Sequence, residues 1–177
     1  MSRLWIALRS IVYATLFLAL WAWAAFKCRL LDKYLSLRMP HGLAAPGMAL
    51  FLAGAALALS TVILFIVAGR GTPAVFDPPR KLVPLGPYRL VRNPMYVGGV
   101  SMLLGLGLYV RSASMTLFAF VTFLIIHTFV VLWEEPGLRK RFGQEYEDYC
   151  RAVPRWIPRF TRRHVSSVGP PPTPRTA

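Results

Sequence analysis

The amino-acid sequence predicts an all-α fold: a polytopic membrane helix bundle of about four spans, with additional amphipathic helices at the interface. Composition is the first reason, because 55% of the 177 residues are hydrophobic and the mean hydropathy is +0.48. Such a chain is too apolar for an ordinary soluble domain and long enough for four or five spans. The second reason is that the apolar residues form long runs separated by basic segments.

The net charge of +14 arises from 21 Lys and Arg residues against 7 Asp and Glu residues. A strongly basic chain can bind nucleic acid. Here the basic residues flank apolar runs, which is typical of membrane-helix ends. We therefore expect membrane lipid, and no nucleic acid, as a partner. The two cysteines, Cys28 and Cys150, form no CxxC motif and predict neither a disulfide framework nor a metal site.

Four apolar runs are the predicted spans, and they cover residues 4–26, 44–68, 94–110 and 113–133. The first run also has a basic front and a faint cleavage site, as a signal peptide would. It is long for a signal peptide, however, and Trp23 next to the cut is unfavourable. The third run reaches only about 25 Å at 1.5 Å per residue, which is barely the thickness of a bilayer core.

The segments between and after the spans have their own patterns. Residues 27–43 alternate leucines with basic residues, which favours a short amphipathic surface helix. Residues 135–152 repeat apolar side chains at helical spacing and predict one amphipathic helix, lying on the membrane or over a pocket. An extended interfacial segment follows at 153–158. Residues 161–177 are rich in Pro, Ser and Arg and predict a disordered tail after a single domain, 1–160.

The stretch from Gly86 to Gly99 joins a polar, basic segment directly to the third apolar run. Pro94 suits the first position of a helix, because its missing N–H would have no partner there. Asn93 before it is a favourable N-cap residue. We therefore expect a helix start that offers a site for an anionic group, or alternatively a plain basic anchor of a span. The neighbouring polar side chains are Tyr88, Arg89, Arg92 and Tyr96.

Two adjacent carboxylates, Glu134 and Glu135, follow the last predicted span. A hairpin out along 94–110 and back along 113–133 returns them to the membrane face of Arg92. In a chain with only 7 acidic residues, such a pair suggests groups that receive hydroxyls or an amine of a polar ligand. The basic segment would then hold the carboxylate of that ligand. A solvated helix end beside basic neighbours is the alternative.

The sequence leaves the roles of two further features open. His127 lies inside the last span, where an ionisable group is a functional candidate, although it can equally bond a neighbouring helix. Residues 69–72 contain two glycines that either let the backbone approach a ligand closely or simply end a helix. His41 is a lone histidine and is expected in a solvated loop.

These motifs resemble those of the membrane methyltransferases that use S-adenosylmethionine, a group that contains the isoprenylcysteine carboxyl methyltransferases and the phosphatidylethanolamine N-methyltransferases. The resemblance rests on residues 92–98 (RNPMYVG) and on 134–136 (EEP) one hairpin later. Residues 142–158 are similar to the C-terminal part of bacterial members. Asn93 stands where isoprenylcysteine enzymes usually carry histidine and is similar to the phospholipid form. The acceptor therefore stays open between a prenylated cysteine carboxylate, a phospholipid amine and a small apolar thiol or acid.

The resemblance implies an enzyme that moves a methyl group from S-adenosylmethionine to a lipophilic or small-molecule acceptor. It implies a cofactor site formed by Tyr88, Arg92, Asn93, Pro94, Tyr96, Gly98, Glu134 and Glu135. Arg92 and the helix start would hold the polar parts of the cofactor, the tyrosines would line the pocket, and the two acids would bind ribose hydroxyls or the amino group. Alanine at Arg92, Glu134 or Glu135 is then expected to weaken cofactor binding without unfolding the bundle.

A non-catalytic membrane assembly or transport subunit is the alternative function. It explains the spans and the charge, but not the paired acids opposite the Arg-Asn-Pro turn.

Four spans place the N-terminus, residues 69–93 and residues 134–177 on one side of the membrane. That side carries most of the Lys and Arg residues, so the positive-inside rule places it, with the cofactor pocket and the C-terminus, in the cytoplasm. S-adenosylmethionine is made inside cells, which agrees. The basic residues of the other side are Lys27, Arg29, Lys33, Arg38 and Arg111.

Overall fold

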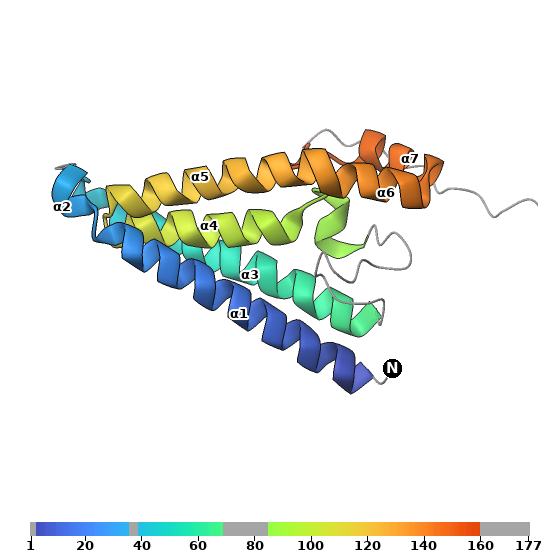
Figure 1. Ribbon diagram of the computed structural model, residues 1–177, viewed down its shortest axis with the longest axis horizontal. Coiled ribbons are helices and arrows are strands. Elements are labelled where there is room, and N and C mark those ends of the chain that lie inside the picture. Colours follow the sequence, from blue (N-terminus) through green and yellow to red (C-terminus); the bar gives the residue numbers. More distant parts are fainter. Residues whose placement is uncertain (1–2, 36–38, 69–84, 160–177) are drawn as a thin grey trace, which may run out of the picture.

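The structure of the protein is a computed structural model that describes residues 3–35, 39–68 and 85–159. These residues form a bundle of long helices with short helices at both ends (Figure 1). The predicted disordered tail, 161–177, and the glycine-containing segment 69–72 lie outside the described residues. Both expectations therefore stay predictions.

The long helices coincide with the four apolar runs of the sequence. They are α1 (Arg3–Arg29), α3 (Ala44–Ala68), α4 (Pro94–Tyr109) and α5 (Ala113–Phe129). The shorter elements are α2 (Asp32–Leu35), α6 (Glu135–Phe142), α7 (Gln144–Ala152), two 3₁₀ turns at His41–Leu43 and Gly86–Arg89, and a π-helical turn at Val130–Glu134. Because the described residues contain no β-strand, the predicted all-helical fold is confirmed for them.

Two helical stretches within the described part of the chain are long and apolar enough to cross a membrane, His41–Leu64 and Ala113–Phe142. Pro94–Tyr109 is apolar but shorter. This finding supports association with a membrane. The four-span arrangement stays a prediction from the sequence, since α1 and α4 are not among the two stretches that meet the criterion.

The tightest packing in the bundle joins α3 to α4 through glycines. A methyl group added at Gly105 would lie 2.4 Å from the backbone nitrogen of Phe51, and one at Gly54 would lie 2.7 Å from the carbonyl oxygen of Gly98. Such distances leave no room for any side chain, so the two backbones are in direct contact. Small residues allow this close approach of helices.

The connection between α1 and α3 differs from the predicted surface helix over 27–43. Helix α1 continues to Arg29, and only the four residues of α2 follow it before residues 36–38, which are not described. The side chain of Asp32 explains this arrangement, because its Oδ1 accepts a hydrogen bond of 2.9 Å from the backbone N–H of Ser114. Asp32 thereby attaches α2 to the first turn of α5, so this segment does not form the predicted helix along the membrane surface.

The C-terminal half departs from prediction at two places. Helix α5 does not end at Glu134; it continues through the π-helical turn into α6. Pro136 has no backbone N–H to donate to the preceding turn. The wider π turn accommodates this missing hydrogen bond without ending the helix. The predicted single helix over 135–152 is also wrong, because Gly143 has φ of 52° and separates α6 from α7. Only glycine adopts this conformation readily.

Helices α6 and α7, the start of α4 and the N-terminal end of α1 all lie at one end of the bundle, and α2 lies at the other (Figure 1). The hairpin of α4 and α5 therefore returns the acids at 134 and 135 to the arginine at 92, as the sequence predicts.

Candidate functional site

Helix α4 begins at Pro94 with Asn93 as its N-cap residue, and the carbonyl of Asn93 accepts the N–H of Val97 at 3.1 Å. The position of the helix start is as predicted, but the side chain of Asn93 makes no capping bond. Instead its Nδ2 lies 3.5 Å from the carbonyl oxygen of Arg155. The expectation of a side-chain cap is therefore wrong, because the nearly buried amide faces the C-terminal segment.

That segment, Val153–Arg159, is called the strap from here on. It crosses from the start of α4 to the end of α5. The carbonyl of Pro154 accepts the backbone N–H of Arg92 at 2.8 Å, while the indole N–H of Trp156 donates to Nδ1 of His127 at 3.0 Å. The strap thus pairs with the backbone of Arg92, two residues before α4 begins.

Glu135 is the most enclosed charge of the described residues, with 2% of its surface exposed. Arg155 binds it through two hydrogen bonds, Nε to Oε1 at 2.6 Å and Nη2 to Oε2 at 2.9 Å. Nη2 of Arg92 lies 3.3 Å from Oε1, and Nη2 of Arg139 lies 3.8 Å from Oε2. The bond to Glu135 raises the pKa of Arg155 above its usual value. Glu135 therefore ties α4, α6 and the strap together.

Arg92 is engaged on several sides. Besides Glu135, its Nη1 donates to the sulfur of Cys150 on α7. Only 10% of its side chain is exposed, and its buried Nε has no partner in the protein. Arg92 is thus a structural link that keeps one unsatisfied donor.

Glu134 faces a different environment from its neighbour. Its Oε2 accepts the hydroxyl of Tyr96 at 3.0 Å, and no ion pair with an arginine or lysine of the described residues is found for it. Burial raises the pKa of the nearby Tyr88 phenol, and Tyr149 and the charge of Glu134 raise it further. The hydroxyl of Tyr149 donates to the backbone carbonyl of Tyr88 at 2.7 Å and holds the Gly86–Arg89 turn in place.

The structure thus places seven of the eight predicted residues at one end of the bundle. Gly98 is one turn into α4, where an added methyl group would lie 2.8 Å from the carbonyl oxygen of Gly54. Close packing against α3 accounts for this glycine without a ligand. His127 bonds Trp156 of the strap and not a neighbouring helix, so its partner is neither of those left open by the sequence.

Four contacting residues were not assigned to the site by sequence reasoning, although Tyr149 and Arg155 fall within the stretch that resembles other methyltransferases. They are Tyr149, Cys150, Arg155 and Trp156. For Arg155, the available signal in the sequence was its charge, which is opposite to that of Glu135. Their partners are 20 to 61 residues away in sequence, so no local pattern identifies the pairs.

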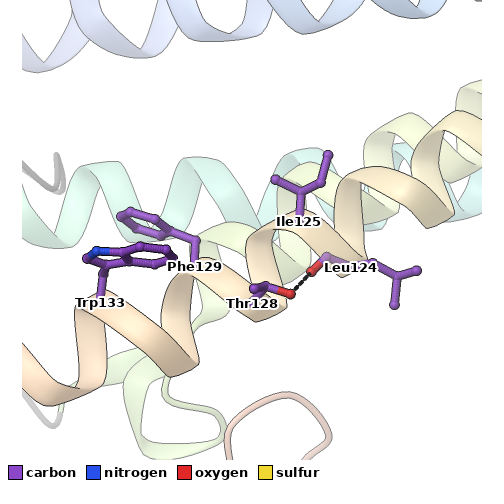
Figure 2. Close-up of a pocket in the computed structure, with 5 residues that line it drawn as sticks. All are labelled: Leu124, Ile125, Thr128, Phe129 and Trp133. Carbon is purple, nitrogen blue, oxygen red and sulfur yellow. Dashed lines mark hydrogen bonds between the residues drawn. The ribbon is translucent and has the colours of Figure 1, made fainter.

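A shallow apolar groove of about 410 Å³ lies on the outer face of α5 and the π-helical turn (Figure 2). It is lined by Leu124, Ile125, Thr128, Phe129 and Trp133. Thr128 donates its hydroxyl to the carbonyl of Leu124 at 2.9 Å, so that hydroxyl hydrogen is already engaged within α5. Trp133, at one end of this groove, directly precedes Glu134. Within the described residues no group of three or more His, Cys, Asp or Glu side chains could hold a metal ion.

Comparison with known proteins agrees with this architecture. The model of the phospholipid methyltransferase family matches residues 43–145, which is more than half of the chain. The protein therefore belongs to the phospholipid methyltransferase family. The matched range contains all eight predicted site residues and ends before the strap.

Two curated relatives are similar over a shorter region. The nickel-cobalt-cadmium resistance protein NccN of Alcaligenes xylosoxydans xylosoxydans is 31% identical over 46% of this chain and 38% of its own length. The cobalt-zinc-cadmium resistance protein CzcN of Cupriavidus metallidurans is 34% identical over 45% of this chain and 37% of its own length. The chain thus matches less than two fifths of either relative.

Proposed function

We propose that this protein is an integral membrane methyltransferase that moves a methyl group from S-adenosylmethionine to a lipophilic or small acceptor. The observation that carries the proposal is the asymmetry of the two acids. Glu135 is neutralised by arginines, whereas Glu134 contacts the hydroxyl of Tyr96. In a family of methyltransferases, a carboxylate that has no cationic partner among the described residues fits the hydroxyls or the ammonium of the cofactor.

The other polar groups present fit the same ligand. S-adenosylmethionine carries a carboxylate at one end, and the unsatisfied Nε of Arg92 is a buried donor suited to an anion. Tyr88 and Tyr96 offer aromatic faces beside Glu134. The apolar groove near Trp133 offers a surface for the hydrocarbon part of a lipophilic acceptor. Isoprenylcysteine-carboxylate-like and phospholipid-amine-like acceptors both fit such a surface.

When bound, the cofactor supplies a methyl group on a positively charged sulfur. The protein has to hold both partners in line and to exclude water from them. Glu134 and Tyr96 orient one end of the ligand, because each is fixed by its bond to the other. The strap, pinned at Arg92 and at His127, covers the helix ends on the aqueous side. The proposal places this end of the bundle in the cytoplasm, on the charge asymmetry of the sequence.

The test is calorimetric titration of the purified protein with S-adenosylmethionine and with S-adenosylhomocysteine. A charge-assisted hydrogen bond contributes about 1.5–3 kcal/mol, and about 1.4 kcal/mol corresponds to a tenfold change. Glu134→Ala should therefore raise the dissociation constant about ten- to a hundredfold, and Glu134→Gln should raise it less. Glu145→Ala, an exposed acid on α7, is the matched control. If Glu134→Ala binds as tightly as the parent protein, the site is elsewhere.

A second candidate function is a non-catalytic membrane subunit, and the printed names of the two relatives favour it. Both are named as metal resistance proteins, so this protein is alternatively an accessory component of a metal resistance system. The two candidates differ in what Glu134 does. Metal tolerance of a deletion strain should be restored by the Glu134→Ala variant if the role is accessory. Transfer of a radiolabelled methyl group to a lipid or protein fraction, lost in Glu134→Ala, supports the enzyme.

A further inference from the structure

The strap lies beyond the region that matches the family, since the match ends at residue 145. Two kinds of contact hold it. Near its start, Arg155 binds the buried Glu135 through two charge-assisted hydrogen bonds. One residue further on, Trp156 bonds His127 on α5 and packs edge-on against Phe123, with ring centroids 5.3 Å apart. The strap therefore bridges the two helices whose ends carry Tyr96 and Glu134.

The two contacts differ in strength. A pair of charge-assisted bonds to a buried carboxylate is among the strongest interactions in proteins. The bond from Trp156 to His127 joins two neutral groups and contributes much less. An indole nitrogen can only donate, so Nδ1 of His127 accepts and its ring proton is on Nε2. Beyond this point Ile157 is exposed, with 76% of its surface accessible. The contact at Trp156 is thus the weaker and outer one.

We propose that the strap is a gate over the ligand site, with Arg155 as its hinge and the Trp156–His127 bond as its latch. The gate rests on the proposed function, while the latch does not. When the latch opens, residues 156–159 leave α5 and the ends of α4 and α5 are exposed to water. When it closes, the ligand is held. Trp156 and His127 are accordingly positioning residues that set how fast S-adenosylhomocysteine leaves.

Hydrogen–deuterium exchange of the purified protein without ligand tests the latch. Trp156→Phe keeps an aromatic ring against Phe123 and removes the donor, and His127→Phe removes the acceptor. Each should raise exchange of the peptide containing residues 153–159 about three- to tenfold, the loss expected for one neutral hydrogen bond. The double variant should exchange no faster than either single one. The matched control is Trp23→Phe, at an exposed tryptophan of α1. Unchanged exchange in Trp156→Phe would overturn the latch.

Stopped-flow displacement of S-adenosylhomocysteine tests the gate. Trp156→Phe should increase the dissociation rate by the same three- to tenfold factor, while Trp23→Phe should not change it. Faster exchange with an unchanged dissociation rate would overturn the gate and leave the latch standing. Absence of any S-adenosylhomocysteine binding by the folded parent protein would instead overturn the proposed function, and the gate with it. The exchange result still decides the latch in that case.

Discussion

Glu134 and Glu135 are neighbours in sequence, yet their surroundings are electrostatically opposite. One carboxylate meets a tyrosine hydroxyl, and the other meets three guanidinium groups at distances of 2.6 to 3.8 Å. A carboxylate whose oxygens already contact arginines has few acceptor positions left for a ligand. The two acids thus have separate roles in our proposal: Glu134 receives the ligand, and Glu135 holds the structure around it.

At the residue scale we predict that Glu135→Ala destabilises the protein by about 3–5 kcal/mol. Removing one partner of a buried ion pair leaves the other charges uncompensated, here those of Arg92 and Arg155. This revises the sequence-based expectation that the variant keeps a folded bundle with weaker binding. Unfolding in detergent, followed by circular dichroism, measures the effect. The exposed control Glu145→Ala should change stability by no more than about 0.5 kcal/mol. Matching curves for Glu135→Ala and the parent would contradict the structural role.

At the scale of elements, the contact of α3 with α4 sets where the site can form. Their glycines bring the two backbones together, and α4 then presents Tyr96 toward Glu134 at the end of the π-helical turn. The π-helical turn has a matching effect on the other helix, since it ends at Glu134 immediately before the buried Glu135. Single π turns occur frequently at functional sites. Here the turn adjusts the direction of both acids.

We predict that Gly105→Ala destabilises the bundle and that Gly99→Ala does not. An added methyl group at Gly105 would overlap the backbone of Phe51, whereas none of the surrounding atoms lies within 4 Å of one at Gly99. Overpacking costs about 1–3 kcal/mol, while alanine in an open helical position is favoured over glycine by up to about 1 kcal/mol. Thermal unfolding in detergent should therefore shift in opposite directions. Equal shifts for both variants would argue against backbone contact between α3 and α4.

At the scale of the whole molecule, the bundle has two chemically different ends. One end carries α6, α7 and the strap; the other carries α2 and the turn before α5 (Figure 1). Arg111 of that turn lies beside His41, with its Nη1 3.1 Å from Nε2, so His41 has a partner at the far end. From the charge asymmetry of the sequence we propose that the α6–α7 end faces the cytoplasm.

Cysteine labelling of intact cells tests this orientation. Ser112, on the connecting turn, is fully buried and caps α5, so a cysteine there would be inaccessible. Gly42 is exposed with nothing within 4 Å and is the better far-end position, and exposed Lys140 represents the α6 end. An impermeant thiol reagent should label Gly42→Cys in intact cells and Lys140→Cys only after permeabilisation, relative to the parent chain. The reverse pattern would invert the proposed topology.

The sequence by itself determined the helical class, the approximate positions of the long helices and the end of the bundle where Arg92 meets the acids. These features follow from local composition and from the geometry of a helical hairpin, both of which can be read within one window or across one short turn. The four spans, the orientation and the cofactor remain predictions of that sequence and of the family to which it belongs.

Only the tertiary structure decided which acid is paired and what the C-terminal segment does. The contacts of Arg155 with Glu135 and of Trp156 with His127 join residues 20 and 29 positions apart. No periodicity encodes such a pair, because distance along the chain does not fix distance in space once a turn intervenes. The directions of Glu134 and Glu135 depend in addition on a π turn, whose extra residue rotates every side chain after it. The sequence therefore identifies two acids, and packing alone assigns them different roles.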